Sequence, residues 1–262
     1  MTEPTPASVA VVGSNDGPDA LIARPTEKLT PAQRKAALEA IASEVRACRR
    51  CPLWAGRTNA VPGEGDPDTE VVFVGEGPGF NEDRQGRPFV GRAGDLLVRL
   101  IATLGWRRQE VFITNVVKCR PPENRDPEAA EIAACEPFLR RQLEVLDPAL
   151  VVTLGRYSMG HFMPGARIGG AHGTMAPVDP MTGARSALVY ALYHPAAALR
   201  SPDVERQSYA DVAGIPAALT EARRRRATMP AVPADAAPGP LPAAHSLPVD
   251  APVHPAEPPT LF

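Results

Sequence analysis

Four cysteines, the whole complement of this 262-residue chain, occur as one C-x2-C pair followed by two isolated residues: Cys48, Cys51, Cys119 and Cys135. Four thiolates with none left over are the donor set of an all-cysteine metal site, either a structural zinc or an iron–sulfur cluster. Zinc favours two tight C-x2-C knuckles, and only one pair here is tight, so the spacing favours a cluster without excluding zinc. Unligated buried thiols are the alternative. The same stretches carry candidate catalytic motifs, which indicates that the metal and the chemistry share one domain.

Short apolar runs alternate with helical patterns along the middle of the chain. The patterns predict strands at 71–74, 111–114, 150–154 and 187–193, and helices after Thr30-Pro31, before Gly105, at 128–146, after Gly155 and from 207 to about 226. This alternation favours an α/β fold with a parallel sheet and helices on both faces. Ligands of such folds bind at the carboxyl ends of the strands.

Composition places this domain at 28–226, between two flanks. Residues 1–27 and 227–262 contain many prolines and no apolar periodicity, so we expect both to be disordered. No apolar run approaches the ~20 residues that span a bilayer, and the N-terminus lacks the pattern of a secretory signal. We therefore expect a cytoplasmic monomer without a membrane partner, in a compartment where thiols stay reduced.

The last residues suggest a partner. The chain ends in Leu261-Phe262 after the proline- and alanine-rich stretch. Such endings resemble the peptides that dock into the bacterial sliding clamp, although Glu257 and Pro258 stand where a glutamine is usual. A short anchor on a flexible tether is the functional interpretation, and chance is the alternative.

Four features follow predicted strands or lie in polar loops. The glycines of GEGPG at 75–79 let backbone approach a ligand, although the segment is neither a P-loop nor a dinucleotide fingerprint and a plain turn is the alternative. Phe89, in a polar loop, is either a core plug or a ring on which a flat ligand stacks. Asn115 offers a donor and an acceptor that suit the edge of a base, or it caps a turn. His194 is stiffened by Pro195 and is either structural or functional.

Taken together, these motifs resemble the family 4 (type IV) uracil-DNA glycosylases, iron–sulfur members of the uracil-DNA glycosylase superfamily. The resemblance covers roughly residues 40–215 and rests on Cys48-x2-Cys51, GEGPG at 75–79 with Glu82-Asp83, GRPFVGRAG at 86–94, TNVVKCRPPENR at 114–125, Cys135, and HPAAALR at 194–200. It implies a three-layer α/β/α sandwich around a four-stranded parallel sheet. It also implies a [4Fe-4S] cluster on the four cysteines.

The resemblance assigns roles to the pocket. Phe89 would stack on uracil, Asn115 would read the pyrimidine edge, and His194 would donate toward uracil O2. Glu76 and Gly77 would line the pocket beside the sugar. Other families of the superfamily place a catalytic acid at the position of Gly77.

The remaining roles concern water and DNA. Glu82 is the predicted group that positions water or stabilises positive charge. Leu199 would enter the DNA groove, while Arg200 and Arg120 would hold phosphates. A related group that attaches covalently to DNA has a reactive histidine in the segment equivalent to 120–127, which contains none here.

We therefore expect a monofunctional repair enzyme that excises uracil from DNA and turns over. Two other classes remain open. One is a four-cysteine nucleic-acid-binding module without catalysis. The other is a glycosylase for another deaminated base such as hypoxanthine.

Overall fold

The computed structural model describes residues 29–229. The predicted lead at 1–27, most of the tail predicted at 227–262, and the clamp-like ending lie outside the described residues. The domain boundary predicted at 226 falls inside a helix, because α10 (Ile215–Thr228) continues to Thr228. Arginine is a good helix former and its charge suits a helix C-terminus, so the arginine-rich segment extends the helix.

A six-stranded sheet in the order β1-β3-β2-β4-β6-β5 forms the centre of the described domain. Its strands are β1 (Glu64–Gly65), β2 (Val71–Gly75), β3 (Phe112–Asn115), β4 (Leu150–Leu154), β5 (Met175–Pro177) and β6 (Leu188–Leu192). Strands β3, β2, β4 and β6 pair in parallel, which confirms the four predicted strands. The short edge strands β1 and β5 pair antiparallel and were not predicted. A two-residue strand has no periodicity, and β5 contains a proline, which sheets accept at edges.

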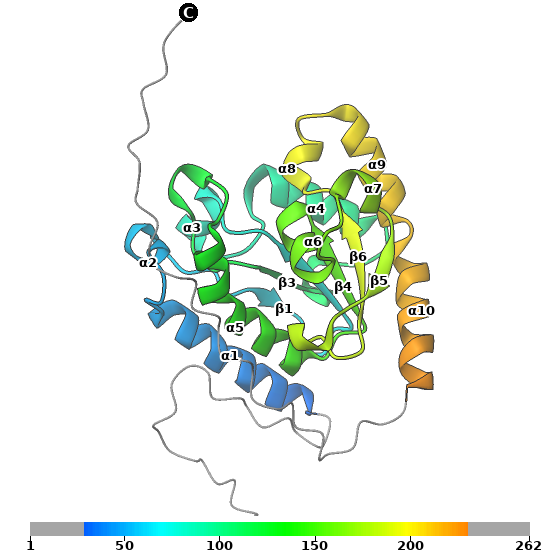
Figure 1. Cartoon of the computed structure of the whole chain (residues 1–262), viewed down its shortest axis with the longest axis horizontal. Helices are drawn as coiled ribbons and strands as arrows, with labels where there is room; N and C mark the ends of the chain where they lie inside the picture. The colour runs from blue at the N-terminus through cyan, green and yellow to red at the C-terminus, as the bar shows by residue number, and fades with distance from the viewer. Residues whose placement is uncertain (1–28, 230–262) are drawn as a thin grey trace, which may run out of the picture. The chain divides into compact units, whose positions relative to one another are not determined.

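Helices cover both faces of this sheet (Figure 1). Residues on β2 alternate between two cores: Val72 and Val74 join the core with α1 (Pro31–Ala47) and α5 (Ala129–Leu146). Val71 and Phe73 join the core that includes α4 (Gly91–Ala102), α9 (Pro202–Val212) and α10. Short helices complete the domain: α2 (Leu53–Gly56), α3 (Phe80–Gln85), α6 (Arg156–Phe162), α7 (Ile168–Ala171), α8 (Pro195–Ala198), and the 3₁₀ turns η1 (Arg108–Glu110), η2 (Pro122–Asn124) and η3 (Pro180–Thr182). The three-layer sandwich predicted from the sequence is therefore confirmed.

The first helix begins where the sequence predicts. The N–H of Gln33 donates to Thr30 Oγ1 over 3.3 Å, and the N–H of Thr30 donates to Gln33 Oε1 over 2.9 Å, so the two residues form a capping box. Pro31 occupies the first helical position. Because α1 ends at Ala47, Cys48 enters the following loop.

The last predicted helix is two helices. The chain breaks between α9 and α10 at Gly214, and a Cβ there would overlap the Tyr190 hydroxyl. That hydroxyl donates to the carbonyl of Asp211 over 2.7 Å, which stabilises the break. Periodicity alone missed it because both helices have apolar positions facing the same core. No helix within residues 29–229 is both long and apolar enough to cross a membrane.

The carboxyl ends of the four parallel strands meet at one edge of the sheet. Gly75 at the end of β2 pairs with Asn115 at the end of β3, and Leu154 of β4 pairs with Leu192 of β6. Strands β3 and β4 lie on opposite sides of β2. The direction in which successive strands are added to the sheet therefore reverses at β2, and such a switch point opens a crevice at the carboxyl edge.

Candidate active site and cysteine centre

Asn115 and the Phe89 ring meet over Gly75 at this edge. A Cβ on Gly75 would lie within 2.5 Å of Phe89 Cζ and closer still to Asn115 Oδ1, so only glycine leaves room for both groups. The Asn115 side chain is buried, with 1% of the residue exposed. Its Oδ1 has no hydrogen-bond partner among the described residues. A buried acceptor without a donor is rare, and it indicates a ligand that brings one.

Phe89 has a strained backbone. Its φ of 49° lies in the left-handed region, where a bulky residue is an outlier. Arg108 stabilises this conformation, because its Nη1 donates to the Phe89 carbonyl over 3.0 Å and its Nη2 donates to the Pro88 carbonyl. Glu64 in turn pairs with Arg108 over 2.9 Å. Gly94 makes room on the other side, since a Cβ there would overlap the main chain of Phe89.

His194 follows β6 and caps α8. Its Nδ1 accepts the N–H of Ala196 over 3.1 Å, so in the neutral ring the proton is on Nε2. Burial, and secondarily the charge of Arg200, lowers the pKa of His194 to about 4. The ring centroid lies 5.7 Å from that of Phe89. Gly155 (φ 92°) is also required here, because a Cβ on it would lie 2.8 Å from His194 Cβ.

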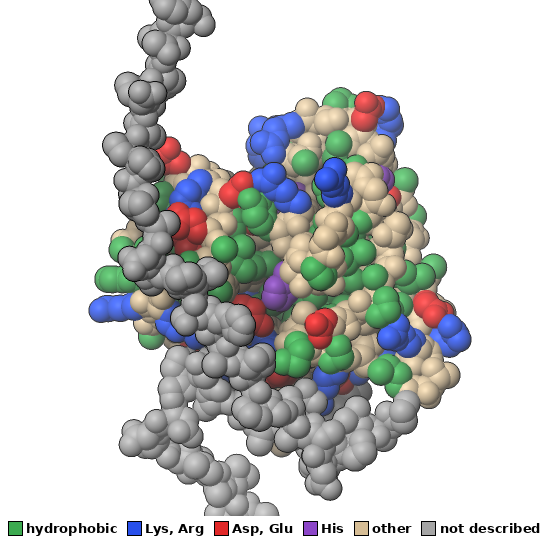
Figure 2. Space-filling view, viewed as in Figure 1, with side chains coloured by type: hydrophobic (Ala, Val, Ile, Leu, Met, Phe, Trp, Pro, Cys, Tyr) green, Lys and Arg blue, Asp and Glu red, His purple; other side chains and the backbone are tan. Residues whose placement is uncertain are grey.

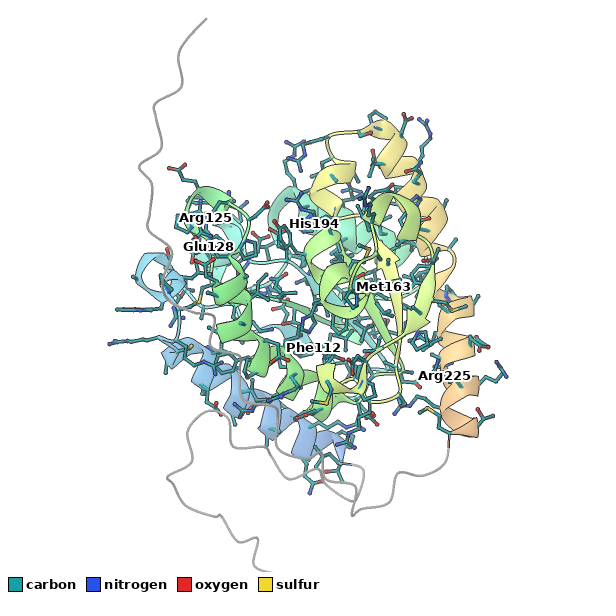
Figure 3. The ribbon with its side chains drawn as sticks, viewed as in Figure 1. Phe112, Arg125, Glu128, Met163, His194 and Arg225 are labelled. Atoms are coloured by element: carbon teal, nitrogen blue, oxygen red, sulfur yellow. The ribbon has the colours of Figure 1, made fainter. Side chains whose placement is uncertain are left out.

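Figure 3 shows His194 at the upper end of the sheet, whereas Phe112, which begins β3, lies near its lower end. The histidine is therefore at the same carboxyl edge as Asn115. Because the pKa of His194 is about 4, its ring is neutral at pH 7. It can therefore donate a hydrogen bond through Nε2–H, but it carries no extra proton to give up as a general acid.

Glu76 directly follows β2 and is half-buried. Burial raises the pKa of its carboxyl group, the charge of Asp126 raises it further, and Arg156 lowers it. Asp126 and Arg156 form an ion pair of 2.5 Å between the loop before α5 and α6. The next residue, Gly77, lies against a neighbouring loop, since a Cβ on it would lie 2.7 Å from Val117 Cγ2.

Glu82 bridges two loops of the site. Its Oε2 accepts the N–H of Gly79 over 3.1 Å, and its Oε1 accepts the N–H of Val90 over 2.9 Å. Both carboxylate oxygens therefore join the GEGPG loop to the loop that carries Phe89. That Glu82 positions water stays a prediction. The neighbouring Asp83 is buried and accepts the N–H of Thr58 over 2.9 Å, a contact that sequence reasoning missed.

All four cysteines line one small cavity, which brings together the end of α1, the loop after β3, and α5: Cys48, Cys51, Cys119 and Cys135. Within residues 29–229, no group of three or more Cys, His, Asp or Glu side chains has the geometry to hold a single metal ion. Four cysteine thiols around one cavity are a complete set of ligands for an iron–sulfur cluster, so the residues present fit that group.

Two hydrogen bonds reach these sulfur atoms. Arg57 Nη1 donates to Cys119 Sγ over 3.0 Å, and the N–H of Lys118 donates to Cys135 Sγ over 3.2 Å. Burial raises the pKa of Cys135 to about 12, so the unliganded thiol is protonated at neutral pH. A metal must displace this proton, and donors to sulfur stabilise the thiolate charge that remains.

Lys118 connects the two centres. It is buried, and its Nζ donates to Thr114 Oγ1 over 2.6 Å, to the Asn115 carbonyl over 2.7 Å and to Gln142 Oε1 over 2.7 Å. Burial lowers the pKa of this amino group to about 7. Because Lys118 also precedes Cys119, one residue supports both the Asn115 backbone and the cysteine centre. The signal in the sequence was a lysine in a chain whose basic residues are mostly arginine.

Basic side chains lie at the rim of the crevice. Arg120 donates from Nε to Asn124 Oδ1 over 2.7 Å, and its guanidinium lies 5.2 Å from the centre of the Phe80 ring. Arg200 is exposed just beyond α8, and Leu199 packs partly against the core. Figure 2 shows Lys and Arg side chains on both sides of the notch between α3 and α8.

Comparison with known proteins identifies this arrangement. The family model of the uracil DNA glycosylase superfamily matches residues 62–213 of the 262. The chain belongs to the uracil DNA glycosylase superfamily. It is 49% identical over 175 residues to a type-4 uracil-DNA glycosylase of Sulfurisphaera tokodaii, covering 64% of this chain and 79% of the relative. A type-4 uracil-DNA glycosylase of Saccharolobus solfataricus is 48% identical over 189 residues, covering 70% of this chain and 87% of the relative. A type-4 uracil-DNA glycosylase of Thermotoga maritima is 45% identical over 168 residues, covering 64% of this chain and 86% of the relative.

The uracil DNA glycosylase fold gathers the predicted residues into three places. The side chains of Phe89 and Asn115 both lie against Gly75 at the base of the site, and the Phe89 and His194 rings are neighbours. The cysteines lie around their own cavity, and the predicted DNA-contacting residues lie beyond the strand ends. Sequence reasoning singled out Gly75 as a glycine of the GEGPG loop. It missed the positioning roles of Gly94, Arg108, Lys118 and Gly155. Except for Gly94, which lies five residues from Phe89, these residues act on segments far apart in the chain.

Proposed function

We propose that this protein removes uracil from DNA by hydrolysing the N-glycosidic bond, leaving an abasic site. The observation that carries the proposal is the buried, unpaired Oδ1 of Asn115 beside the Phe89 ring and the neutral His194. Uracil has an N3–H donor for this oxygen and an O4 acceptor for the amide NH₂. Cytosine has an acceptor at N3 and a donor at C4, so it would leave both groups of Asn115 unpaired. An unpaired buried polar group is strongly unfavourable, which explains discrimination between the two bases.

Bond cleavage needs stabilisation of charge on the base. As the C1′–N1 bond breaks, its electron pair moves onto uracil, and negative charge develops at O2. His194 donates to this oxygen through Nε2–H, because Ala196 occupies Nδ1. The sugar becomes an oxocarbenium-like cation, and water then adds at C1′ and loses a proton.

Negative charge beside the sugar stabilises that cation. We assign this role first to Glu76, which is half-buried directly after β2. Gly77 lines the same loop. Glu82 contributes its charge and is the candidate for orienting water, while it holds the two pocket loops together through Gly79 and Val90.

Access to the base requires that uracil leave the helical stack. Unpairing and unstacking the base costs a few kcal/mol, and the cost is smallest for a mismatched or single-stranded base. Leu199 takes the place of the extruded base, and Arg200 and Arg120 hold phosphates. Phe89 then stacks on the uracil ring.

The four cysteines hold a [4Fe-4S] cluster in this proposal. Such a group would supply structural stability here, since its ligands come from α1, the loop after β3, and α5. The test is chemical analysis of protein purified without oxygen. We expect iron and acid-labile sulfide near four per chain, as the cluster's composition requires. Stoichiometric zinc without iron would contradict it.

The activity is tested on oligonucleotides that contain uracil, hypoxanthine or no lesion, in single- and double-stranded form and with EDTA. We expect release of uracil that EDTA does not abolish, and a loss of about 10² or more in His194→Ala, the usual effect of removing a transition-state donor. Binding without release of any base would favour a nucleic-acid-binding module. Release of hypoxanthine in preference to uracil would favour a glycosylase for another deaminated base.

A further inference from the structure

Phe80 is an aromatic residue that the fold leaves in solvent. It is the first residue of α3, and 51% of it is exposed. It belongs to none of the described core clusters. Because only Pro78 and Gly79 separate it from Gly77, at most about 10 Å of chain joins it to the pocket-lining loop. Phe80 therefore lies close to the loop that is proposed to line the uracil pocket.

Two guanidinium groups lie near this ring. The carbon atom of the Arg84 guanidinium lies 5.6 Å from the ring centre, and that of Arg120 lies 5.2 Å from it. Both distances are within the range of a cation–π interaction. An exposed aromatic ring among arginines is the pattern that nucleic-acid-binding surfaces use, because the ring stacks on bases and the cations attract phosphates.

Arg120 is held in place before any ligand arrives. Asn124 Oδ1 accepts from its Nε over 2.7 Å, and the Phe80 ring lies against its guanidinium. Asn124 has a φ of 57°, a left-handed conformation that asparagine tolerates better than most residues. Within the described residues no hydrogen bond occupies the two terminal nitrogens of Arg120, so a bidentate phosphate contact needs no other bond to break.

We propose that Phe80 is a base-stacking contact for the DNA strand that carries the uracil. Its ring stacks on the base adjacent to the extruded nucleotide, while Arg120 holds the neighbouring phosphate. When uracil leaves the stack, the adjacent base loses a stacking partner, and the ring replaces it. Leu199, directly after α8, acts from the other side of the pocket. This inference rests on the proposed function.

The test uses DNA that cannot react. A single-stranded oligonucleotide with a tetrahydrofuran abasic site and 2-aminopurine as the adjacent base reports binding by anisotropy of an end label and stacking by 2-aminopurine fluorescence. The variants are Phe80→Ala, Phe80→Trp, and Met181→Ala as a control, since Met181 is an exposed apolar residue on η3. Iron content and circular dichroism verify that each variant is folded.

We expect Phe80→Ala to weaken binding about tenfold, the effect of removing one base–aromatic stack, and to abolish the change in 2-aminopurine fluorescence. Phe80→Trp should retain both signals, and Met181→Ala should behave as the unmodified protein. Equal affinity and an equal fluorescence change in Phe80→Ala would overturn the proposal.

Two further measurements separate this inference from the proposed function. If the unmodified protein releases no uracil from DNA, the proposed function is wrong, whatever Phe80 does in the binding assay. If it releases uracil, free uracil should inhibit the unmodified protein and Phe80→Ala equally, because the substitution leaves the pocket intact. A weaker inhibition of Phe80→Ala would place the ring in the pocket and would contradict a stacking contact outside it.

Discussion

The main-chain N–H of Ala196 donates to Nδ1 of His194 over 3.1 Å. This bond gives the ring a defined tautomer with its proton on Nε2. Burial keeps the ring neutral, because the pKa of His194 is lowered to about 4. The histidine can therefore donate to a developing oxyanion throughout the neutral range without first gaining a proton.

The pKa of His194 is directly measurable. We expect the ring Cε1–H resonance to titrate with a midpoint near 4, below the ordinary value of about 6.5. The ring is neutral above the midpoint and charged below it. The resonance is assigned by its loss in His194→Gln. A midpoint near 6.5 would show that the ring is solvated and would remove the basis for a neutral donor.

Glu76 should determine how the reaction rate falls at acidic pH. Burial raises its pKa, so the carboxylate that is proposed to stabilise the sugar cation is lost at a higher pH than for an exposed glutamate. The single-turnover rate should fall as pH decreases through this raised pKa. In Glu76→Gln the rate should be lower at pH 7 and nearly independent of pH. An unchanged acid limb in that variant would assign the titration to another group.

Gly75 should tolerate no side chain. A Cβ there would collide with both Phe89 and Asn115. We expect Gly75→Ala to reduce uracil release by about 10² or more, as loss of a positioned transition-state contact does. The matched control is Gly160→Ala on α6, where an added Cβ meets nothing within 4 Å. This substitution should change the rate of uracil release less than about twofold, which corresponds to a small change in activation free energy. Equal rates in the two variants would mean that the pocket is elsewhere.

Arg108 should position Phe89 without touching DNA. Arg108→Met removes both hydrogen bonds to the carbonyls of Pro88 and Phe89, so the strained backbone should relax and the ring should move. We expect weaker inhibition by free uracil together with a slower rate. The neighbouring Arg107, which pairs with Glu110 on the surface, gives the control Arg107→Met. Unchanged uracil inhibition in Arg108→Met would argue against stacking by Phe89.

Arg57 should tune the cysteine centre. Its Nη1 donates to Cys119 Sγ, and both the hydrogen bond and the positive charge favour the more negative, reduced form of a cluster. Arg57→Met should therefore lower the reduction potential, measured by a redox titration, while iron content stays near that of the unmodified protein. Arg49→Met is the control, because the Arg49 guanidinium stacks on Trp54. The same shift in both variants would indicate an effect of charge alone.

Local patterns were sufficient for much of the fold. The apolar runs at β2, β3, β4 and β6 are buried on both faces, so their hydrophobicity appears in the sequence without any tertiary information. Thr30 as N-cap with Pro31 at the first helical position marked the start of α1 correctly, because a cap involves only residues close together in the chain. Strands β1 and β5 and the break at Gly214 escaped prediction because each depends on a distant partner.

The sequence by itself determined which chemical groups are available and the order in which they follow the strands. Asn115 and His194 became candidates because Asn115 ends β3 and His194 follows β6 by two residues, and parallel strands share one carboxyl edge. The resemblance to a known family then gave them roles. Only the tertiary structure decided how these groups are held. Gly75 under Phe89, Arg108 on the Phe89 carbonyl, and Lys118 on Gln142 are contacts between segments distant in the chain. Steric exclusion and buried hydrogen bonds act over a few ångströms of space, and no local pattern of residues records which distant atoms will lie that close.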